Sequence, residues 1–316
     1  MFCIGSRPFP LIPPKTDHLE SWEASLKEEY AYNCLKVVDN SMIFTEKWDT
    51  LVQPAFWRNA MDLSPDSLII NIAKTRQVIG YIPYKHWRGM SERKLRSYED
   101  SIRQAYQLGK KDEIYFTNGR SHFYQFHKVL PEISRAVEVF HAEGVDPWYA
   151  QTILLIESPG RLQFSTEGAY GAFQLMEGVA KEVGLVINDT LDEREDFEKS
   201  AVGAARLIQR TCIPKAKVLA DHWQLEYKED DLWFRLLVLH VYHAGFGNVR
   251  RVLRKIRPTE GGIPLFLQLW QTKGRRFGNA SQNYSQIALA SLMELEEIIQ
   301  EEVILCPDDW QAQITD

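Results

Sequence analysis

The sequence predicts a mainly α-helical protein, and three observations support this fold class. Apolar residues recur at helical spacing through most of the chain beyond residue 128. Prolines and glycines stand where these periodic segments begin and end, and strand signals are few. Of the 316 residues, 45% are hydrophobic, which is enough for a sizeable core. We therefore expect a helical domain over residues 129–316, preceded by a smaller mixed, mostly helical N-terminal region over residues 1–128.

Apolar periodicity and end signals predict helices in seven segments. Glycines follow three of these segments, at positions 109, 144 and 184, as is typical of helix C-termini. In chain order the segments are residues 92–108, 131–144, 147–158, 172–183, 196–210, 231–243 and 283–303.

Two of these helices have the clearest signals. Asp146 and Pro147 form an N-cap and first-turn pair for the helix 147–158, and Pro159 ends it. Residues 231–243, DLWFRLLVLHVYH, are apolar nearly all round, which predicts a buried central helix.

Two local predictions concern the remaining segments. The segment 172–183 is predicted to be helical because four inward-facing apolar residues recur at helical spacing: Phe173, Met176, Val179 and Val183. Earlier in the chain, Asn118-Gly119 lies between the aromatic runs 114–116 and 123–124. This arrangement predicts a small β-hairpin.

Charge and cysteine content exclude several classes of protein. The net charge of -6 and the scattered basic residues argue against nucleic-acid binding. One basic cluster occurs at helical spacing and is expected to be a solvated helix face: Arg250, Arg251, Arg254, Lys255 and Arg257. No run of about 18 apolar residues occurs, so no transmembrane segment is expected. The four cysteines lack CxxC spacing, which argues against a zinc ribbon or a redox motif: Cys3, Cys34, Cys212 and Cys306.

The stretch ILLIESPG at 153–160 places one acid, Glu157, at the end of an apolar helix. A carboxylate near a helix C-terminus meets an unfavourable dipole, and aliphatic neighbours reduce its hydration. Both effects raise the pKa of a carboxyl group, and an acid that stays protonated near neutral pH can act as a general acid. The alternative is that Glu157 points into water while its neighbours point inward, and this stretch alone favours that alternative.

The residues that follow, SPGRLQFSTEGAYGAFQLM, favour a ligand site instead. Gly168, Ala169 and Gly171 have little or no side chain, which would let a ligand approach the backbone closely. Ser165 and Gln174 offer polar groups that suit a substrate such as a sugar. A tight turn between packed helices would explain the glycines, but not the polar residues beside them.

Three blocks, in order, resemble the catalytic domain of the soluble lytic transglycosylases, whose relatives include the goose-type lysozymes. The first block lies within residues 157–180, the second is VYHAGFGNV at 241–249, and the third is QNYSQIALA at 282–290. The resemblance covers about residues 130–295 and implies a lysozyme-like helical catalytic domain. Residues 1–128 match no family by their motifs, and their role stays open; substrate binding and packing on the catalytic domain are two candidates. The first block consists of Glu157, Ser158, Ser165, Gly168, Ala169, Gly171, Gln174, Met176 and Ala180.

The resemblance implies a lytic murein transglycosylase, a carbon–oxygen lyase that cleaves the β-1,4 bond between N-acetylmuramic acid and N-acetylglucosamine in peptidoglycan. Glu157 matches the catalytic glutamate of the family. It would protonate the glycosidic oxygen as a general acid and then accept the proton of the C6 hydroxyl group as that hydroxyl closes on C1. The product carries a 1,6-anhydro ring, and no water is incorporated. Most glycosidases need two carboxyl groups, whereas this reaction needs one.

The resemblance also implies which residues bind the substrate. Tyr242 and Tyr284 match active-site tyrosines of the family, although each could instead be a core tyrosine whose hydroxyl group finds a partner. Ser165 and Gln174 match positions that contact the substrate, and Met176 would line the wall of the cleft.

The sequence departs from the family pattern at two places. His243 stands where the family usually has asparagine, so the subsite differs, and a charge on the ring would change the pH range. Pro159-Gly160 replaces a stretch that commonly contains an aromatic residue, so the loop after the acid differs in shape. His240 and His243 could also meet on one helix face and bind a metal ion. No acid or cysteine completes such a site, and His240 is expected to be a core histidine.

Two other functions stay open. If Glu167 positioned a water molecule, the protein would be a hydrolytic muramidase; Glu177 is expected to face away from the cleft. A peptidoglycan-binding protein without turnover is the alternative from another class, although the retention of Glu157 argues against it. Four aromatic residues of the N-terminal region could stack on sugars, but such residues are more often part of a core: Trp57, Tyr81, Tyr84 and Trp87.

The implied partners are peptidoglycan glycan strands, which would place the protein in the bacterial cell envelope, in the periplasm. The first residues, MFCIGSRPFPLIPPK, contain no apolar segment of signal-peptide length. We therefore expect that an export signal has been removed from this chain. We expect no metal ion, no organic cofactor and no nucleic-acid partner.

Overall fold

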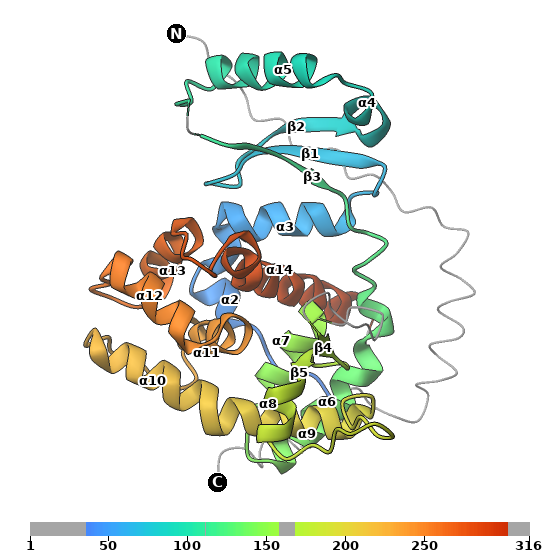
Figure 1. The fold of residues 1–316 in the computed structure, drawn as a ribbon, viewed down its shortest axis with the longest axis vertical. Coiled ribbons are helices and arrows are strands. Elements are labelled where there is room, and N and C mark those ends of the chain that lie inside the picture. The colour runs from blue at the N-terminus through green and yellow to red at the C-terminus, as the bar shows by residue number, and fades with distance from the viewer. Residues whose placement is uncertain (1–35, 111, 158–167, 303–316) are drawn as a thin grey trace. The chain divides into compact units, whose positions relative to one another are not determined.

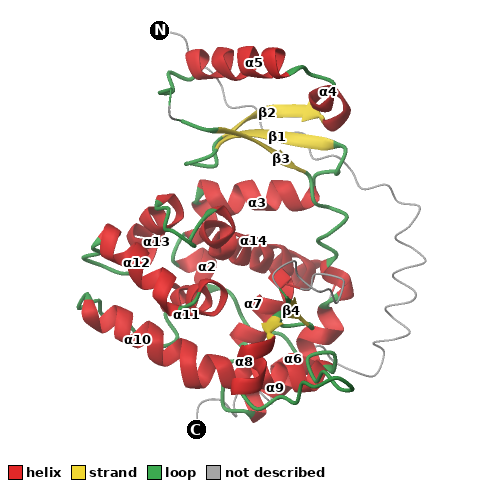
Figure 2. Cartoon of the chain, viewed as in Figure 1, coloured by secondary structure: helices red, strands yellow, loops and turns green. Residues whose placement is uncertain are grey.

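The computed structural model describes residues 36–110, 112–157 and 168–302, and these residues belong to one compact unit that spans residues 36–303. The fold is mainly α-helical, with 59% of the described residues in helices and 10% in strands (Figures 1 and 2). The predicted fold class is therefore confirmed. None of the described helices combines the length and the apolar character that are needed to cross a bilayer.

The first described elements pack against the last helix. They are α2 (Met42–Thr45), a short 3-10 helix (Trp48–Thr50) and α3 (Val52–Asp62), and α3 lies along α14 (Asn279–Glu302). Trp57 of α3 is buried and donates a hydrogen bond from Nε1 to Oε1 of Gln286 on α14, at 3.1 Å. The two sides of the predicted boundary near residue 128 thus share one core.

A three-stranded antiparallel sheet follows, built from β1 (Ser67–Ile72), β2 (Val78–Pro83) and β3 (Ile114–Asn118) in the order β2-β1-β3. In Figure 1 the sheet lies between α5 (Glu92–Ala105) and α3, and α4 (Tyr84–Arg88) follows β2 directly. The central strand β1 is covered on both faces, which explains why the last five residues of SLIINI are all buried, without alternation. The apolar cluster between sheet and helix contains Leu68, Ile70, Ile82, Ile102 and Ile114.

The predicted hairpin at Asn118-Gly119 is wrong, because β3 pairs with β1 and not with residues 123–124. A Cβ atom on Gly119 would lie 2.3 Å from the carbonyl oxygen of Leu63 and 2.1 Å from that of Ser64. Glycine is therefore required here by close backbone packing at the end of β3. The hairpin of this region connects β1 and β2, and its turn contains Arg76 in the left-handed conformation, with φ 62°.

The helical part is built around α7 (Trp148–Glu157), which packs on α6 (Leu130–Ala142) and on α14. Residues 148–156 are all buried. The Trp148 N–H donates to Oδ1 of Asp146 at 3.0 Å, so the predicted N-cap is confirmed. The predicted central helix is also confirmed: it is α11 (Leu232–Ala244), and nine of its residues are buried. The other helices are α8 (Glu177–Glu182), α9 (Phe197–Leu207), a π-helical turn (Ile208–Cys212), α10 (Ile213–His222), α12 (Phe246–Ile256) and α13 (Gly262–Gln271).

The predicted helix 172–183 is wrong in its first half. Residues Ala169–Tyr170 form β4 and Leu175–Met176 form β5, two short antiparallel strands, and the helix α8 begins only at residue 177. Gly171 and Gln174, between these strands, have φ values of 80° and 48°. A right-handed helix cannot include such residues. The helical spacing of the apolar residues here was coincidental.

Candidate active site

Glu157 is the last residue of α7, and its side chain is half-buried in the wall of a cleft. The buried residues before it form the core part of the helix, which carries the carboxyl group out to the cleft. Burial raises the pKa of Glu157 to about 7, and a hydrogen bond from Tyr284 opposes this shift. The loss of hydration that the apolar stretch led us to expect is therefore present, and a large fraction of the carboxyl groups is protonated at neutral pH.

Tyr284, on α14, is the direct partner of this carboxyl group. Its hydroxyl group donates a hydrogen bond to Oε1 of Glu157 at 2.9 Å. Burial, followed by the nearby charge of Glu157, holds the pKa of Tyr284 well above its usual range. The phenol therefore keeps its proton and acts as a donor to Glu157, a role that stabilises the ionised carboxylate.

Tyr242, on α11, has a different partner. Its hydroxyl group donates to the carbonyl oxygen of Phe173 at 2.5 Å, which connects α11 to the turn between β4 and β5. Burial and then the charge of Glu157 raise its pKa well above the usual range. Tyr242 thus lies close enough to Glu157 to be affected by its charge, but it makes no hydrogen bond to that residue among those found in the described part of the chain.

His243 stacks on Tyr284, with ring centroids 4.2 Å apart and an interplanar angle of 19°. His243 is exposed to the cleft. The protein atoms that surround it nevertheless reduce the hydration of its charged form, which lowers the pKa of His243 to about 4. The imidazole is therefore neutral over the range in which Glu157 titrates. At this position the neutral ring can replace the side-chain amide of the asparagine that the resembled family usually has, without adding a charge.

The cleft has a volume of about 850 Å³ and two different walls. One wall is helical and comes from the end of α7, the end of α11 and the beginning of α14. The other comes from β3 and the loop that follows it, residues 114–124, together with α4 and the β1–β2 turn. We call these the helical wall and the sheet wall. The N-terminal part of the chain thus contributes directly to the cleft that contains Glu157.

Tyr124 and Phe123 bring the sheet wall close to the acid. Tyr124 is buried, and burial raises its pKa to about 12. The positive charge of Arg120 lowers this pKa, and the negative charge of Glu157 raises it. Phe123 is 39% exposed, although it is a large apolar ring. An exposed aromatic ring in a cleft is a candidate surface for a ligand.

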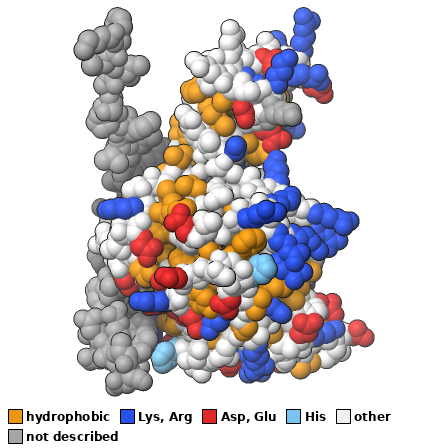
Figure 3. Space-filling view, turned by 90° about the vertical axis from the view of Figure 1, so that its left-hand side faces the viewer, with side chains coloured by type: hydrophobic (Ala, Val, Ile, Leu, Met, Phe, Trp, Pro, Cys, Tyr) orange, Lys and Arg blue, Asp and Glu red, His pale blue; other side chains and the backbone are white. Residues whose placement is uncertain are grey.

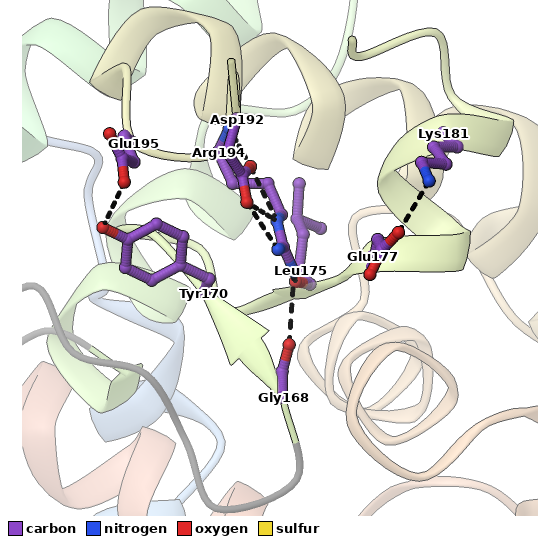
Figure 4. Close-up of polar contacts among 8 residues, drawn as sticks. All are labelled: Gly168, Tyr170, Leu175, Glu177, Lys181, Asp192, Arg194 and Glu195. Carbon is purple, nitrogen blue, oxygen red and sulfur yellow. Dashed lines mark hydrogen bonds and ion pairs between the residues drawn. The ribbon is translucent and has the colours of Figure 1, made fainter. Parts of the chain in front are cut away.

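Arg194 holds the β4–β5 hairpin in place (Figure 4). Its guanidinium group forms hydrogen bonds to both carboxylate oxygens of Asp192 and donates to the carbonyl oxygens of Gly168 and Leu175, at 3.2 and 3.0 Å. A Cβ atom on Gly171 would lie 2.0 Å from the carbonyl oxygen of Arg194. The close approach that requires Gly171 is therefore to protein backbone, not to a ligand, which corrects the interpretation of this glycine.

The structure does not bring every predicted site residue into the cleft. Glu157, His243 and Tyr284 line it, whereas Gln174 and Met176 lie in the β4–β5 hairpin and are not part of its described lining. Gln174 donates a hydrogen bond from Nε2 to the carbonyl oxygen of Gly171 at 2.9 Å, and the Met176 side chain is 45% exposed. Tyr242 is not part of the described lining either. Ser165 lies outside the described residues, as do Glu167 and Pro159.

Other residues considered from the sequence have clear positions. Glu177 forms an ion pair with a lysine one turn along α8 and is not part of the cleft lining (Figure 4). Among the N-terminal aromatic residues, Trp57 and Trp87 line the cleft. Tyr81 is exposed elsewhere, and Tyr84 packs on the apolar cluster of the sheet.

His240 is a core histidine, as predicted. It is fully buried, and its Nε2 lies 2.8 Å from Oγ of Ser285. Burial and then His243 lower its pKa to about 3, so it is neutral. Within the described part of the chain, no group of histidines, cysteines and acids is arranged to hold a metal ion.

The basic cluster of α12 is a solvated helix face, as predicted. Its five basic side chains are exposed, while Val249, Val252 and Leu253 are buried on the opposite face. Lys and Arg side chains gather in one area of the molecule in Figure 3, which views it from the side of α12 and α13.

Three residues that line the cleft were not predicted from the sequence as site residues: Arg76, Phe123 and Tyr124. They precede the segment that resembles the lytic transglycosylases, so the resemblance could not assign them. For Phe123 and Tyr124 the only available signal was the run YFTNGRSHFY at 115–124, which is rich in aromatic residues, and Arg76 lies outside that run.

Comparisons with known proteins add no assignment. No family model matches the chain, and no curated protein matches its sequence significantly. A function is therefore inferred from the residues themselves and from the geometry of the cleft.

Proposed function

We propose that the protein is a peptidoglycan lytic transglycosylase that cleaves the bond between N-acetylmuramic acid and N-acetylglucosamine and leaves a 1,6-anhydromuramic acid end. The observation that carries this proposal is the environment of Glu157. Its carboxyl group lies in the wall of a cleft, has a pKa raised to about 7 by burial, and accepts a hydrogen bond from Tyr284 at 2.9 Å. Such a group can both donate and accept a proton near neutral pH.

The number of carboxyl groups supports a reaction that needs only one. Glu157 is the only acidic residue among the described residues that line the cleft. Inverting and retaining glycosidases instead place two carboxyl groups about 5–10 Å apart across the bond. A single acid fits a reaction in which the sugar's own C6 hydroxyl group takes the place of water.

The proton transfers balance with this one residue. Protonated Glu157 donates its proton to the glycosidic oxygen as the bond to C1 breaks. The resulting carboxylate accepts the proton of the C6 hydroxyl group as its oxygen bonds to C1, and the enzyme returns to its starting state. The hydrogen bond from Tyr284 stabilises the carboxylate between the two steps, and the reduced hydration favours the protonated form before them.

The shape and lining of the cleft suit a glycan strand. Its volume of about 850 Å³ is within the range of sites that hold extended ligands. Trp87, Phe116 and Phe123 supply aromatic rings from the sheet wall, and aromatic rings combine apolar area with defined geometry. We thus propose that the N-terminal region is part of the substrate-binding site. A peptidoglycan substrate would place this activity in the bacterial cell envelope.

Digestion of purified peptidoglycan tests the proposal. Wild-type protein and Glu157→Gln are incubated with it at pH 6, and the soluble products are identified by mass spectrometry. We expect anhydro-muropeptides from the wild type and a rate at least about 10³-fold lower from the variant, since its amide cannot transfer the proton. Products one water heavier would indicate a muramidase. Binding of glycan strands with no products from the wild type would indicate a binding protein.

A further inference from the structure

Arg76 is a buried cation in the cleft without a carboxylate partner. It is 4% exposed and lines the cleft from the β1–β2 turn. No ion pair joins it to an acid within the described residues, and Tyr115 is the only ionisable neighbour that shifts its pKa by charge. Burial lowers the pKa of Arg76 to about 10, so the group stays charged at neutral pH.

The contacts of Arg76 hold the guanidinium group in place but do not neutralise it. Nη2 donates to Oδ1 of Asn279 at 2.7 Å and to Oδ1 of Asn283 at 2.6 Å, and both of these acceptors are uncharged. The group also lies over the rings of Phe56, Trp57 and Tyr115, with 5.4, 5.8 and 5.6 Å to the ring centroids. No hydrogen bond from Nε or Nη1 to a described residue is found. A buried charge of this kind is costly unless an opposite charge pairs with it.

The position of Arg76 is linked to that of the proposed catalytic acid through α14. Asn279 and Asn283 lie one helical turn apart and bind Arg76, while the next residue, Tyr284, donates to Glu157. The first turns of α14 thus connect both groups, and both line the same cleft. A ligand that occupies this cleft beside Glu157 would extend toward the guanidinium group.

We propose that Arg76 forms an anion subsite that binds a carboxylate carried by the muramyl residue of the substrate. This inference rests on the proposed function, because that function supplies the substrate. Peptidoglycan offers two sources of such a carboxylate: the stem peptide attached to the muramyl residue, or the lactyl group itself when the stem has been removed. Arginine suits the role because its planar fork can donate two parallel hydrogen bonds to one carboxylate.

Three soluble substrates made from the same glycan strands separate these sources. The first keeps its stem-peptide carboxylates, the second has them converted to methylamides, and the third has its stems removed by an amidase. Wild-type protein should have a KM about 10-fold or more lower for the first than for the second, as expected for a hydrogen-bonded charge. A low KM for the third substrate as well would show that the lactyl carboxylate also occupies the subsite.

Arg76→Met tests whether the preference comes from this residue. Methionine is long and apolar, so it can stay between the aromatic rings without a charge. We expect the KM for the free-carboxylate strands to rise to the value for the methylamides, with little change for the methylamides themselves. A purely structural role would impair both substrates equally and would overturn the proposal. Equal KM values for the two substrates with the wild type would also overturn it.

Two further measurements keep the result interpretable. Thermal unfolding shows whether Arg76→Met is folded, and Arg76→Lys, which retains a charge, should keep part of the carboxylate preference. Muramyl dipeptide and its methylamide, titrated by calorimetry into the wild type and into Arg76→Met, test the subsite without turnover. Preferential binding of the free acid by the wild type, without any cleavage of strands, would support the subsite and count against the transglycosylase. No preference would overturn the subsite.

Discussion

The two walls of the cleft differ in what they contribute. The helical wall holds Glu157, whose proton can be exchanged near neutral pH, together with Tyr284 and His243. The sheet wall provides aromatic rings, and it carries the positive charge of Arg76. We propose that the two walls have different roles, in which the helical wall performs the chemistry and the sheet wall binds the substrate. Changes at Glu157 and Tyr284 of the helical wall should therefore alter kcat and its pH dependence, and changes in the sheet wall should alter KM.

The largest effect among the supporting residues is expected for Tyr284→Phe. The hydroxyl group of Tyr284 stabilises the ionised form of Glu157, so its removal should raise the pKa of Glu157 further above about 7. kcat/KM requires protonated Glu157, so the pH at which kcat/KM declines should rise by about one unit in the variant. We also expect kcat to fall about 10- to 100-fold. A pH–rate profile of both proteins measures these two effects.

Tyr242→Phe is the matched control for this variant. It removes a hydroxyl group that donates to the Phe173 carbonyl oxygen and not to Glu157. Its pH–rate profile should keep the wild-type midpoint. If both tyrosine variants gave the same profile, the special role of Tyr284 would be contradicted.

A smaller effect, on binding alone, is expected for Phe123→Ala in the sheet wall. The ring is 39% exposed, so its removal should change stability little, but a sugar would lose a stacking surface. We expect KM to rise about 3- to 10-fold, with kcat nearly unchanged. Steady-state kinetics would check this, with Phe44→Ala as the control, because Phe44 is 38% exposed and does not line the cleft. A fall in kcat without a change in KM would contradict the proposal that the sheet wall contributes to binding and not to the chemistry.

The smallest effect is expected for His243→Asn, which restores the residue usual in the resembling family. The pKa of His243 is lowered to about 4, so the ring is neutral and its replacement removes no charge near neutral pH. Activity should stay within about threefold of the wild type, and the pH–rate profile should keep its shape above pH 5. The loss of a transition near pH 6 in the variant would show that His243 titrates in the wild type.

The helical wall could be predicted from the sequence to a larger extent than the sheet wall. Strong apolar patterns and end signals located α7, α11 and α14, and the position of Glu157 after an apolar run indicated a group with reduced hydration. The contact between Glu157 and Tyr284 joins residues 127 positions apart, so only the motif resemblance could relate them.

The sheet wall could not be predicted because its determinants are not local. β1 is covered on both faces and lacks alternation, and Gly119 follows an asparagine, as in many hairpin turns, although it serves a close backbone contact.

The β4–β5 hairpin was missed because its apolar residues fall at helical spacing by coincidence. The left-handed backbone of Gln174 that breaks the helix gives no sequence signal, because glutamine rarely adopts it.

We propose that Glu157 alone transfers both protons and that no water enters the product. The most direct test is digestion of purified peptidoglycan in water enriched in ¹⁸O, followed by mass spectrometry of the muramic acid ends. We expect unlabelled 1,6-anhydro ends in wild-type digests and almost no products with Glu157→Gln. Muramic acid ends that carry one ¹⁸O atom would show that water attacks C1, and they would contradict transfer of both protons by Glu157 alone.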